Sequence, residues 1–373
     1  MDKRIIISVT SDLCTDQRVQ KLALSLQNIG FNVLLVGRKI KRSRSFDAPY
    51  PFKRKKLLFE KGFFFYAEYN IRLFVFFLYH KADILFSCDT DTLPANYLAS
   101  KLLRRKLVFD AHEIFPEVPE LVDRKFVKRC WTIIENLIFP KLKYTMTVCD
   151  SLANYYQEKY GIRMRVIRNM AYLNNTNIKP LILSKDKKII LYQGALNKGR
   201  GLEWMIDCMP LLNNCELVII GSGLLRGSLK KRVSKLGIKD KVQFIGKVLP
   251  EELVRYTKAA DIGLCLLENK GLSYYYSLPN RVFDYIQAGI PILASDFPEI
   301  RNIVVTYNTG IVIDQYNRKY LAETITKMLK TGKEAYQENL HEISKELCWE
   351  KEQEKLFELF AEIIEHKSRK HKK

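Results

Sequence analysis

The sequence predicts two α/β domains, each with a parallel β-sheet between layers of helices. Short apolar runs rich in β-branched residues alternate with longer stretches of helical periodicity, which is typical of strand–helix–strand units. This alternation stops near residue 169 and starts again near residue 188. The chain has 373 residues, of which 47% are hydrophobic, enough for two buried cores. We therefore expect two doubly wound, Rossmann-like domains.

The predicted strands are the β-branched runs, and helices are expected between them. In the first half the strands are 4–10, 32–36, 84–87, 107–110 and 145–149. In the second half they are 188–192, 216–220, 242–245, 262–267 and 291–294. The clearest helical stretches are 17–29, 94–103, 202–212 and 251–260.

Domain boundaries follow from where the periodicity is lost. Segment 169–186 contains several Asn and no clear period, so it is predicted to be a linker. The predicted domains are 1–170 and 187–348. Residues 349–373 add a final helix with a wide apolar stripe, followed by a basic tail.

The formal net charge of +21 predicts an anionic partner. Nucleic acid, an anionic membrane surface and a phosphate-bearing small molecule all meet that requirement. No helix-turn-helix, RNA-recognition or zinc-binding pattern is present, so nucleic acid is not expected.

The eight cysteines include no C-x-x-C pair, and several lie in apolar runs, as expected of reduced thiols. No apolar leader follows Met1, and no run of about 18 apolar residues occurs, so neither a signal peptide nor a transmembrane helix is expected. These features favour a cytoplasmic protein.

Candidate ligand-binding residues are sought just after strands, because ligands of parallel sheets bind beyond the carboxyl ends. In segment 277–292, Asn280 could cap a helix over 281–287 that ends at Gly289. The helix N-terminus would suit a diphosphate, and Asp284 could accept hydrogen bonds from ribose hydroxyls. Without a family context, an ordinary capped helix is the favoured interpretation.

A glycine-rich loop follows the strand 188–192. Gly194, Gly199 and Gly201 would let the backbone approach a ligand closely, and Lys198 and Arg200 would neutralise its phosphates. The alternative is a solvated basic turn. Three glycines around two cations favour phosphate binding.

Two loops of the first half complete the candidate residues. In loop 10–18, Asp16 could cap the following helix and Arg18 could reach an anionic ligand. His112 follows the strand 107–110, with Glu113 beside it. A structural role for His112 is weighed equally with a catalytic one.

Two further motifs resemble known binding sites. Gly221-Ser-Gly-Leu-Leu-Arg-Gly227 departs from the dinucleotide spacing, so NAD is not expected, although this loop could meet a nucleotide. Asp89-Thr-Asp91 could share a divalent cation. It also opens a helix, where acids are favoured electrostatically, so no metal or other cofactor is expected.

Taken together, these motifs resemble the family four retaining glycosyltransferases, also called group 1, which have the GT-B fold of two facing Rossmann-like domains. The resemblance covers nearly the whole chain. It is carried by the phosphate loop 194–201, the Gly-Ser-Gly at 221–223, the Leu-Pro-Asn-Arg-x-Phe-Asp-Tyr run with its Ala-Gly-x-Pro ending at 278–291, and the Ala-Ser-Asp-x-Pro-Glu run at 294–299. Trp349 before the last helix also fits.

The resemblance implies roles for individual residues. Lys198, Arg200 and Arg281 would hold the donor diphosphate, and Asp284 corresponds to the second acid of the family's E-x7-E motif, which binds ribose. His112 lies near the family's histidine that contacts the donor sugar. The donor-binding group would also contain Gly221, Gly223 and Asn280. The last helix would cross back to the first domain.

Two positions depart from the family pattern. Tyr276 replaces the first acid of E-x7-E, and Ala195 stands where many relatives have Arg. Arg281 could compensate for the missing acid. The expected activity is metal-independent, retaining transfer of a sugar from a UDP- or GDP-sugar. The alternatives are a sugar-nucleotide epimerase or hydrolase, and an inactive donor-binding protein.

The acceptor is expected on the first domain. Aromatic residues near 63–77 and cations near 39–56 suit the anionic inner face of a membrane, where a lipid-diphosphate-linked glycan would be the acceptor in polysaccharide synthesis. For the aromatic residues, an ordinary core helix is the favoured interpretation.

Overall fold

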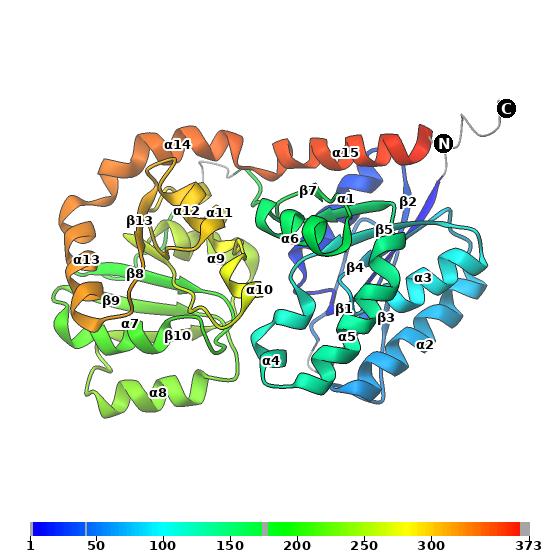
Figure 1. The fold of residues 1–373 in the computed structure, drawn as a ribbon. Helices are drawn as coiled ribbons and strands as arrows, with labels where there is room; N and C mark the ends of the chain where they lie inside the picture. The colour runs from blue at the N-terminus through cyan, green and yellow to red at the C-terminus, as the bar shows by residue number, and fades with distance from the viewer. Residues whose placement is uncertain (1–2, 42, 174–177, 366–373) are drawn as a thin grey trace. The chain divides into compact units, whose positions relative to one another are not determined.

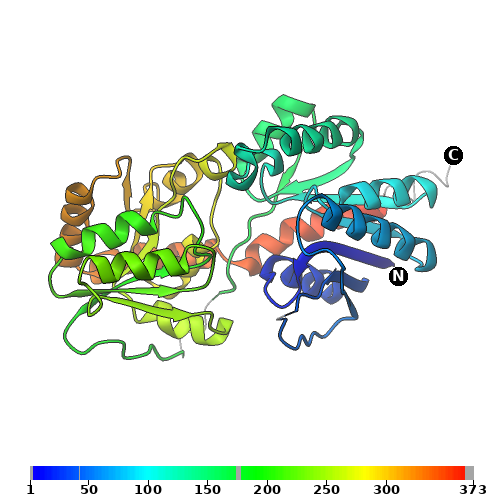
Figure 2. The same cartoon turned by 90° about the horizontal axis from the view of Figure 1, so that it is seen from below.

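A computed structural model describes residues 3–41, 43–173 and 178–365 (Figures 1 and 2). The chain forms two compact units. Unit 1 contains residues 1–168 and 353–373, and unit 2 contains residues 169–352. The first boundary coincides with the start of the predicted linker, whereas the second falls inside the last helix. Residues 174–177 of that linker and the basic tail 366–373 lie outside the described residues.

Unit 1 is built on a sheet of seven parallel strands in the order β3-β2-β1-β4-β5-β6-β7. The strands are β1 (Arg4–Asp12), β2 (Asn32–Arg38), β3 (Phe52–Lys55), β4 (Ile84–Cys88), β5 (Lys106–Ala111), β6 (Tyr144–Thr147) and β7 (Arg165–Val166). The winding reverses between β1 and β4, which leaves room for a ligand at the carboxyl ends of these two strands.

The helices of unit 1 are α1 (Gln17–Asn28), α2 (Phe63–Tyr79), α3 (Leu93–Leu102), α4 (Pro119–Val122), α5 (Lys125–Ile138), α6 (Asp150–Tyr160) and most of α15 (Trp349–Glu365). Successive residues of β4 point to opposite faces of the sheet. Leu85 packs in a core cluster with α2 and α3, whereas Phe86 contacts Phe360 of α15 on the other face (Figure 1). Phe360 also meets Phe31, next to α1.

Unit 2 contains a second parallel sheet in the order β10-β9-β8-β11-β12-β13. The strands are β8 (Lys188–Gln193), β9 (Cys215–Ile220), β10 (Val242–Gly246), β11 (Ile262–Cys265), β12 (Ile292–Ser295) and β13 (Gly310–Ile313). Every residue of β9 is buried, as expected for a strand covered on both faces. Here the winding reverses between β8 and β11.

The helices of unit 2 are α7 (Leu202–Cys208), α8 (Arg226–Lys235), α9 (Pro250–Lys258), α10 (Leu272–Tyr275), α11 (Arg281–Ala288), α12 (Pro298–Val304), α13 (Arg318–Thr331), α14 (Gln337–Glu346) and the start of α15. Residues of α7, α8 and α13 share one core cluster with the sheet. Helices α9 and α14 contact α11 (Figure 1).

The two predicted parallel α/β domains are confirmed, and each predicted strand overlaps an observed one. Three strands were not predicted: β3 contains three cations, β7 has two residues and β13 has four. All eight cysteines are free thiols. Among the described residues, none of the helices is both long and apolar enough to cross a bilayer.

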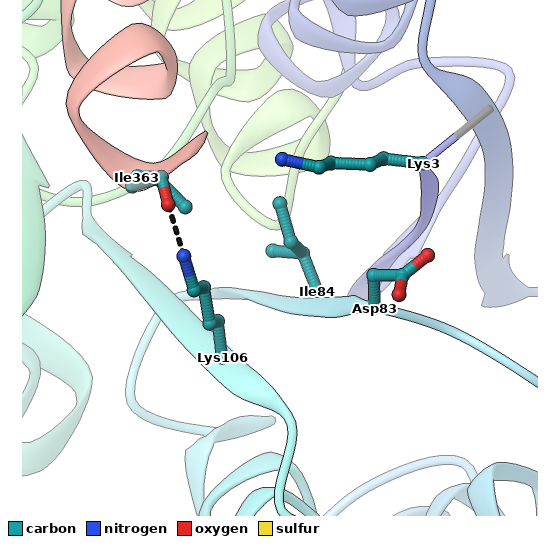
Figure 3. Close-up of a pocket in the computed structure, with 5 residues that line it drawn as sticks. All are labelled: Lys3, Asp83, Ile84, Lys106 and Ile363. Carbon is teal, nitrogen blue, oxygen red and sulfur yellow. Dashed lines mark hydrogen bonds between the residues drawn. The ribbon is translucent and has the colours of Figure 1, made fainter. Parts of the chain in front are cut away.

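A small cavity lies at the amino-terminal edge of the unit 1 sheet (Figure 3). Lys3, Asp83, Ile84, Lys106 and Ile363 line it. The Lys106 ammonium donates a hydrogen bond to the Ile363 carbonyl oxygen, near the end of α15. This cavity is at the edge opposite the carboxyl ends of the strands, and its contacts tie α15 to the sheet.

Candidate functional site

In unit 1, the carboxyl ends of β4 and β5 hold a charged network around His112. Its Nδ1 lies 3.0 Å from Asp89 Oδ2, and its Nε2 lies 2.7 Å from Asp110 Oδ2. Arg18, from the first helix, donates from Nε and Nη2 to the two oxygens of Asp110, each at 2.8 Å. Its Nη1 donates to the Ile167 carbonyl oxygen at 2.9 Å.

The network sets the charge state of His112. Burial alone would lower the pKa of His112, but the Asp89 and Asp110 carboxylates raise it well above its usual value. Burial would raise the pKa of Asp110, yet Arg18 and His112 bring it down to about 2. The two carboxylates therefore favour the imidazolium form of His112, in which both ring N–H groups have a carboxylate partner.

Asp89 and Asp91 have separate partners, although the sequence places them two residues apart. Asp89 adopts a left-handed backbone with φ of 62°, and its Oδ1 accepts the backbone N–H of His112 at 2.8 Å. Asp91 accepts a hydrogen bond from the Thr10 hydroxyl, and its buried Oδ1 has no partner among the described residues. Burial, followed by the charge of Asp89, raises the pKa of Asp91 to about 7.

Cys88, Asp110 and His112 bring potential metal-ligand atoms within 4.8 Å of one another. Their chemistry does not favour a cation. Asp110 already neutralises the Arg18 guanidinium, and burial raises the pKa of the Cys88 thiol well above its usual value, which disfavours the thiolate.

The other predicted residues of unit 1 have structural partners. Asp16 caps α1 as expected, accepting from the Val19 N–H at 3.1 Å. The expectation that Arg18 reaches an anionic ligand is wrong, because its side chain is 3% exposed and fully engaged beneath His112. Glu113 is half-buried, and its carbonyl oxygen accepts from the Tyr156 hydroxyl at 2.9 Å.

In unit 2, the glycines of two neighbouring loops allow these loops to pack together. A side chain at Gly221, whose φ is 137°, would place its Cβ 1.9 Å from the Gly194 carbonyl oxygen. A Cβ at Gly223 would lie 2.4 Å from the Leu196 carbonyl oxygen, and one at Gly201 would lie 2.5 Å from Leu266 Cβ. The packing of these loops therefore requires glycine at these positions, whether or not a ligand binds.

Cations surround the glycine-rich loop. The Arg200 guanidinium stacks over the Tyr274 ring at 4.6 Å, beside Gly199, and the Arg281 guanidinium stacks over Tyr192 at the same distance. Arg200 Nε and Arg281 Nη1 are buried and have no hydrogen-bond partner among the described atoms. Lys198 is exposed on the same loop.

Helix α11 begins and ends where predicted, but its cap differs. Asn280 takes the N-cap position with a helical backbone, and its side chain makes no capping hydrogen bond, so the predicted Asn cap is wrong. Gly289 ends the helix with φ of 70°. Asp284, half-buried, accepts from Gln193 Nε2 at 2.8 Å, and Gln193 Oε1 accepts from the Thr257 hydroxyl at 2.8 Å.

Two residues that hydrogen-bond to predicted site residues were not predicted from the sequence. Asp110 is the last residue but one of β5 and Gln193 is the last residue of β8, and they hold the predicted site residues His112 and Asp284, respectively, in place. A polar residue at the end of an apolar strand, directly before a loop with candidate ligands, was the available signal.

Two family models match consecutive parts of the chain. The one described as Glycosyltransferase Family 4 matches residues 16–173, and the one described as Glycosyl transferases group 1 matches residues 174–347.

Curated relatives include an uncharacterized glycosyltransferase of Methanocaldococcus jannaschii. It is 28% identical over 165 residues, which are 43% of this chain and 41% of the relative. A chitobiosyldiphosphodolichol beta-mannosyltransferase of Candida albicans is 21% identical over 70% of this chain and 62% of its own length. The chain thus spans about two fifths to three fifths of these two relatives.

Solved structures match the chain over nearly its full length. Sucrose-phosphate synthase from Thermosynechococcus elongatus has a TM-score of 0.81 at 17% identity, covering 98% of this chain and 100% of that one. HepE of Anabaena in complex with UDP has a TM-score of 0.67 at 15% identity, covering 96% and 100%. At these identities the likeness shows the fold alone, and that fold agrees with the expected GT-B class.

Proposed function

This chain belongs to the group 1 glycosyltransferases, a family of enzymes, and from that premise we propose that it transfers a sugar from a UDP- or GDP-sugar to a glycan or lipid-linked acceptor. The anomeric configuration is retained and no metal ion is used. The reaction takes place on the cytoplasmic side of the membrane, in the synthesis of a cell-surface polysaccharide.

One observation carries the proposal. Arg200 and Arg281 each hold a buried N–H without a partner beside the glycine-rich loop. A buried N–H of a charged group costs free energy when it has no hydrogen-bond acceptor. Such N–H groups are therefore expected where a bound ligand supplies the acceptor. A diphosphate has the oxygens to accept both, and the exposed Lys198 adds a third positive charge.

The polar group next to this loop suits the rest of a nucleotide. Asp284 is half-buried, and the hydrogen bond from Gln193 Nε2 to its Oδ2 holds the carboxylate in place. A carboxylate held in this way can accept hydrogen bonds from two ribose hydroxyls. HepE, whose structure contains UDP, shares the fold and supports a nucleotide in this class of protein.

In the proposed reaction, the bond between the anomeric carbon and the diphosphate breaks, and the acceptor oxygen bonds to the same face of the sugar. The acceptor proton passes to the departing phosphate oxygen. Lys198, Arg200 and Arg281 stabilise the charge that develops on the diphosphate, which is the task that a metal ion performs elsewhere. This scheme requires no carboxylate nucleophile, unlike that of retaining hydrolases.

His112 is proposed to contact the donor sugar. Its imidazolium is 20% exposed, and so is its partner Asp89, whereas Asp110 is fully buried. The bond to Asp89 is therefore the one that a sugar hydroxyl can replace. Asp110 and Arg18 would keep the ring in place during that exchange.

The experiment is a thermal-shift panel of UDP-, GDP-, ADP- and CDP-sugars in EDTA. Binding to the native state raises the melting temperature, and the responding nucleotide identifies the donor base. Arg200→Ala and Arg281→Ala should abolish the shift, whereas Arg318→Ala, at an exposed site on α13, should preserve it.

The same preparation then separates the alternatives. Product formed with an acceptor supports the transferase. Donor turnover without an acceptor indicates an epimerase or hydrolase, and binding without turnover indicates an inactive donor-binding protein, which the replacement of the first motif acid by Tyr276 would favour. No shift with any donor would contradict the proposed site.

A further inference from the structure

Unit 1 carries a cluster of aromatic rings exposed to solvent at the start of α2. The ring of Phe64 lies 5.2 Å from that of Phe59 and 5.6 Å from that of Phe63. Even so, these rings are 46% (Phe59), 77% (Phe63) and 63% (Phe64) exposed, and the neighbouring Leu58 is 80% exposed. These four residues are called the aromatic tip below.

The aromatic tip is held in a defined position. The carboxylate of Glu68, one turn into α2, accepts the backbone N–H groups of Leu58 and Phe59 at 2.9–3.0 Å. Arg72 pairs with the same carboxylate at 2.7 Å. Because this connection fixes the loop against the helix, the exposed rings are an ordered feature of the surface.

An apolar stripe continues from the tip along the outer side of α2. From Phe64, exposed apolar residues recur at helical spacing along α2. Helix α3 packs alongside α2 (Figures 1 and 2) and carries two more exposed apolar residues. The stripe consists of Ile71, Val75, Leu78 and Tyr79 on α2 and Leu98 and Leu102 on α3, which are 43–82% exposed. The sequence-based expectation of an ordinary core helix therefore holds for the inner side of α2 alone, where Phe65, Phe76 and Phe77 are buried.

Cations border this stripe on the side of β3. The basic cluster consists of Lys53, Lys55, Lys56 and Arg72. The ammonium groups of Lys53 and Lys55 lie 5.4 Å and 4.4 Å from the centre of the same Phe76 ring, and Arg72 Nη1 donates to the Lys56 carbonyl oxygen. Burial, followed by the positive charges of Arg72 and Lys53, lowers the pKa of Lys55. An anionic partner would relieve this repulsion.

We propose that the aromatic tip, the stripe and the basic cluster dock unit 1 onto an anionic lipid bilayer. Rings and aliphatic side chains enter the interface while cations meet the headgroups, the combination that binds peripheral proteins to membranes. A second copy of the chain fits less well, because a symmetric contact would bring two basic clusters and two net charges of +21 together. This inference rests on the proposed function, because docking would give the enzyme access to a lipid-linked acceptor.

The fold places the tip at the edge of the sheet that carries His112. Helix α2 runs back from the carboxyl edge toward the start of β4, so its first residues lie at that edge. Tyr66, in the first turn, contacts the rings of Phe115 and Trp131, with centroids 6.3 Å and 5.1 Å away. Phe115 follows His112 by three residues. An acceptor that extends from the bilayer near the aromatic tip would therefore meet unit 1 at the edge of the sheet that carries His112.

The test is co-sedimentation of the full chain with vesicles of phosphatidylcholine alone and with 30% phosphatidylglycerol, at low and high salt. Strong binding is expected for the anionic vesicles, and salt should weaken it. Phe63→Ser with Phe64→Ser should reduce binding roughly a hundredfold, about tenfold for each ring removed. Lys53→Gln with Lys56→Gln should reduce it about fivefold for each charge.

Matched controls use exposed residues of unit 2. Ile182→Ser removes a side chain that is 85% exposed, and Lys231→Gln with Lys235→Gln removes two cations of α8. Neither should change vesicle binding. The melting temperature of each variant shows that it is folded.

The outcomes separate this inference from the proposed function. Vesicle binding lost in the tip variant, with the donor-induced thermal shift intact, supports docking at this surface. If the unchanged protein does not bind vesicles, or if the control variants lose binding equally, the proposed docking is wrong. The proposed transferase function is not affected by that result. A dimer in solution that the tip variant dissociates would instead make this surface a subunit interface.

Discussion

At the scale of single residues, the Arg18–Asp110–His112–Asp89 network depends on one buried carboxylate. Asp110 is inaccessible to solvent, accepts two hydrogen bonds from Arg18 and one from His112, and compensates charges that would otherwise be buried alone. A buried pair contributes little net stability when intact, but it is costly to break from one side.

Asp110→Asn should therefore lower the free energy of unfolding by about 3–5 kcal/mol, because it leaves Arg18 without its counter-charge. The pKa of His112 should also fall, since one of the two carboxylates that raise it is gone. Urea unfolding and NMR titration of the histidine measure the two effects. Asp123→Asn, at an exposed site, is the control. A loss below about 1 kcal/mol would show that the network is not buried as described.

Glu135 provides a pH-dependent test within the same unit. Its side chain is fully buried on α5, where Tyr160 donates to Oε2 at 2.7 Å, and burial raises its pKa to about 7. The unfolded chain releases this proton near the ordinary value of about 4.3. Between these two pKa values the native state holds a proton that the unfolded state lacks. The free energy of unfolding therefore falls as pH rises through this window, and then levels off.

Glu135→Gln should remove about 3 kcal/mol of this fall in the free energy of unfolding. The stability of the variant relative to the unchanged protein should therefore increase as the pH rises from about 5 to about 8. Asp91, whose pKa is similarly raised, should still contribute to the pH dependence of the free energy of unfolding in this variant. Urea unfolding at four pH values gives the measurement, and Glu358→Gln, which is exposed, serves as the reference. An unchanged slope in the Gln variant would mean that Glu135 is ionised in the native state at pH 5.

At the scale of elements, periodicity predicted the strands and helices that alternate, together with the loops that follow them. It could not reveal which charges meet, because Arg18 and Asp110 are 92 residues apart and come together through strand order alone. It also could not divide the aromatic residues of α2 into buried and exposed sides, since nearly all positions of that helix are apolar. Strand β3 was missed because its cations give no apolar alternation.

The close packing of two glycine loops can be tested by adding one methyl group. Gly221→Ala would force a Cβ against the Gly194 carbonyl oxygen in a backbone conformation that alanine rarely adopts. We expect a loss of at least about 2 kcal/mol and the loss of the donor-induced thermal shift, because the loop that carries Lys198 and Arg200 must move. Unfolding and thermal-shift assays measure the two effects.

Gly227→Ala is the matched control a few residues later. A Cβ added at Gly227 would have no described atom within 4 Å outside its own helix, and the residue lies in the first turn of α8. The change should therefore be neutral or stabilising by about 0.5 kcal/mol. Equal destabilisation by both changes would show that the loop contact is not what requires glycine at 221.

At the scale of the whole molecule, α15 links the two units. Its first residues belong to unit 2, and its remainder completes the core of unit 1, where Phe360 packs between Phe31 and Phe86. The sequence predicted the helix from its apolar stripe. It could not assign the stripe to a sheet from periodicity, and only the family resemblance suggested a return to the first domain.

Because each unit has its own sheet and core, calorimetry should resolve two unfolding transitions. Phe360→Ala should lower the transition of unit 1, with a cost of about 3–5 kcal/mol, and Leu340→Ala in α14 should lower that of unit 2 by about 2–5 kcal/mol. The nucleoside diphosphate of the responding donor, without its sugar, should raise the transition that Leu340→Ala lowers and leave the other unchanged. Its proposed phosphate and ribose contacts all lie in unit 2, whereas His112 of unit 1 is proposed to contact only the sugar. If instead one transition responds equally to both substitutions and to the nucleotide, the units fold as a single cooperative body and the ligand is held by both.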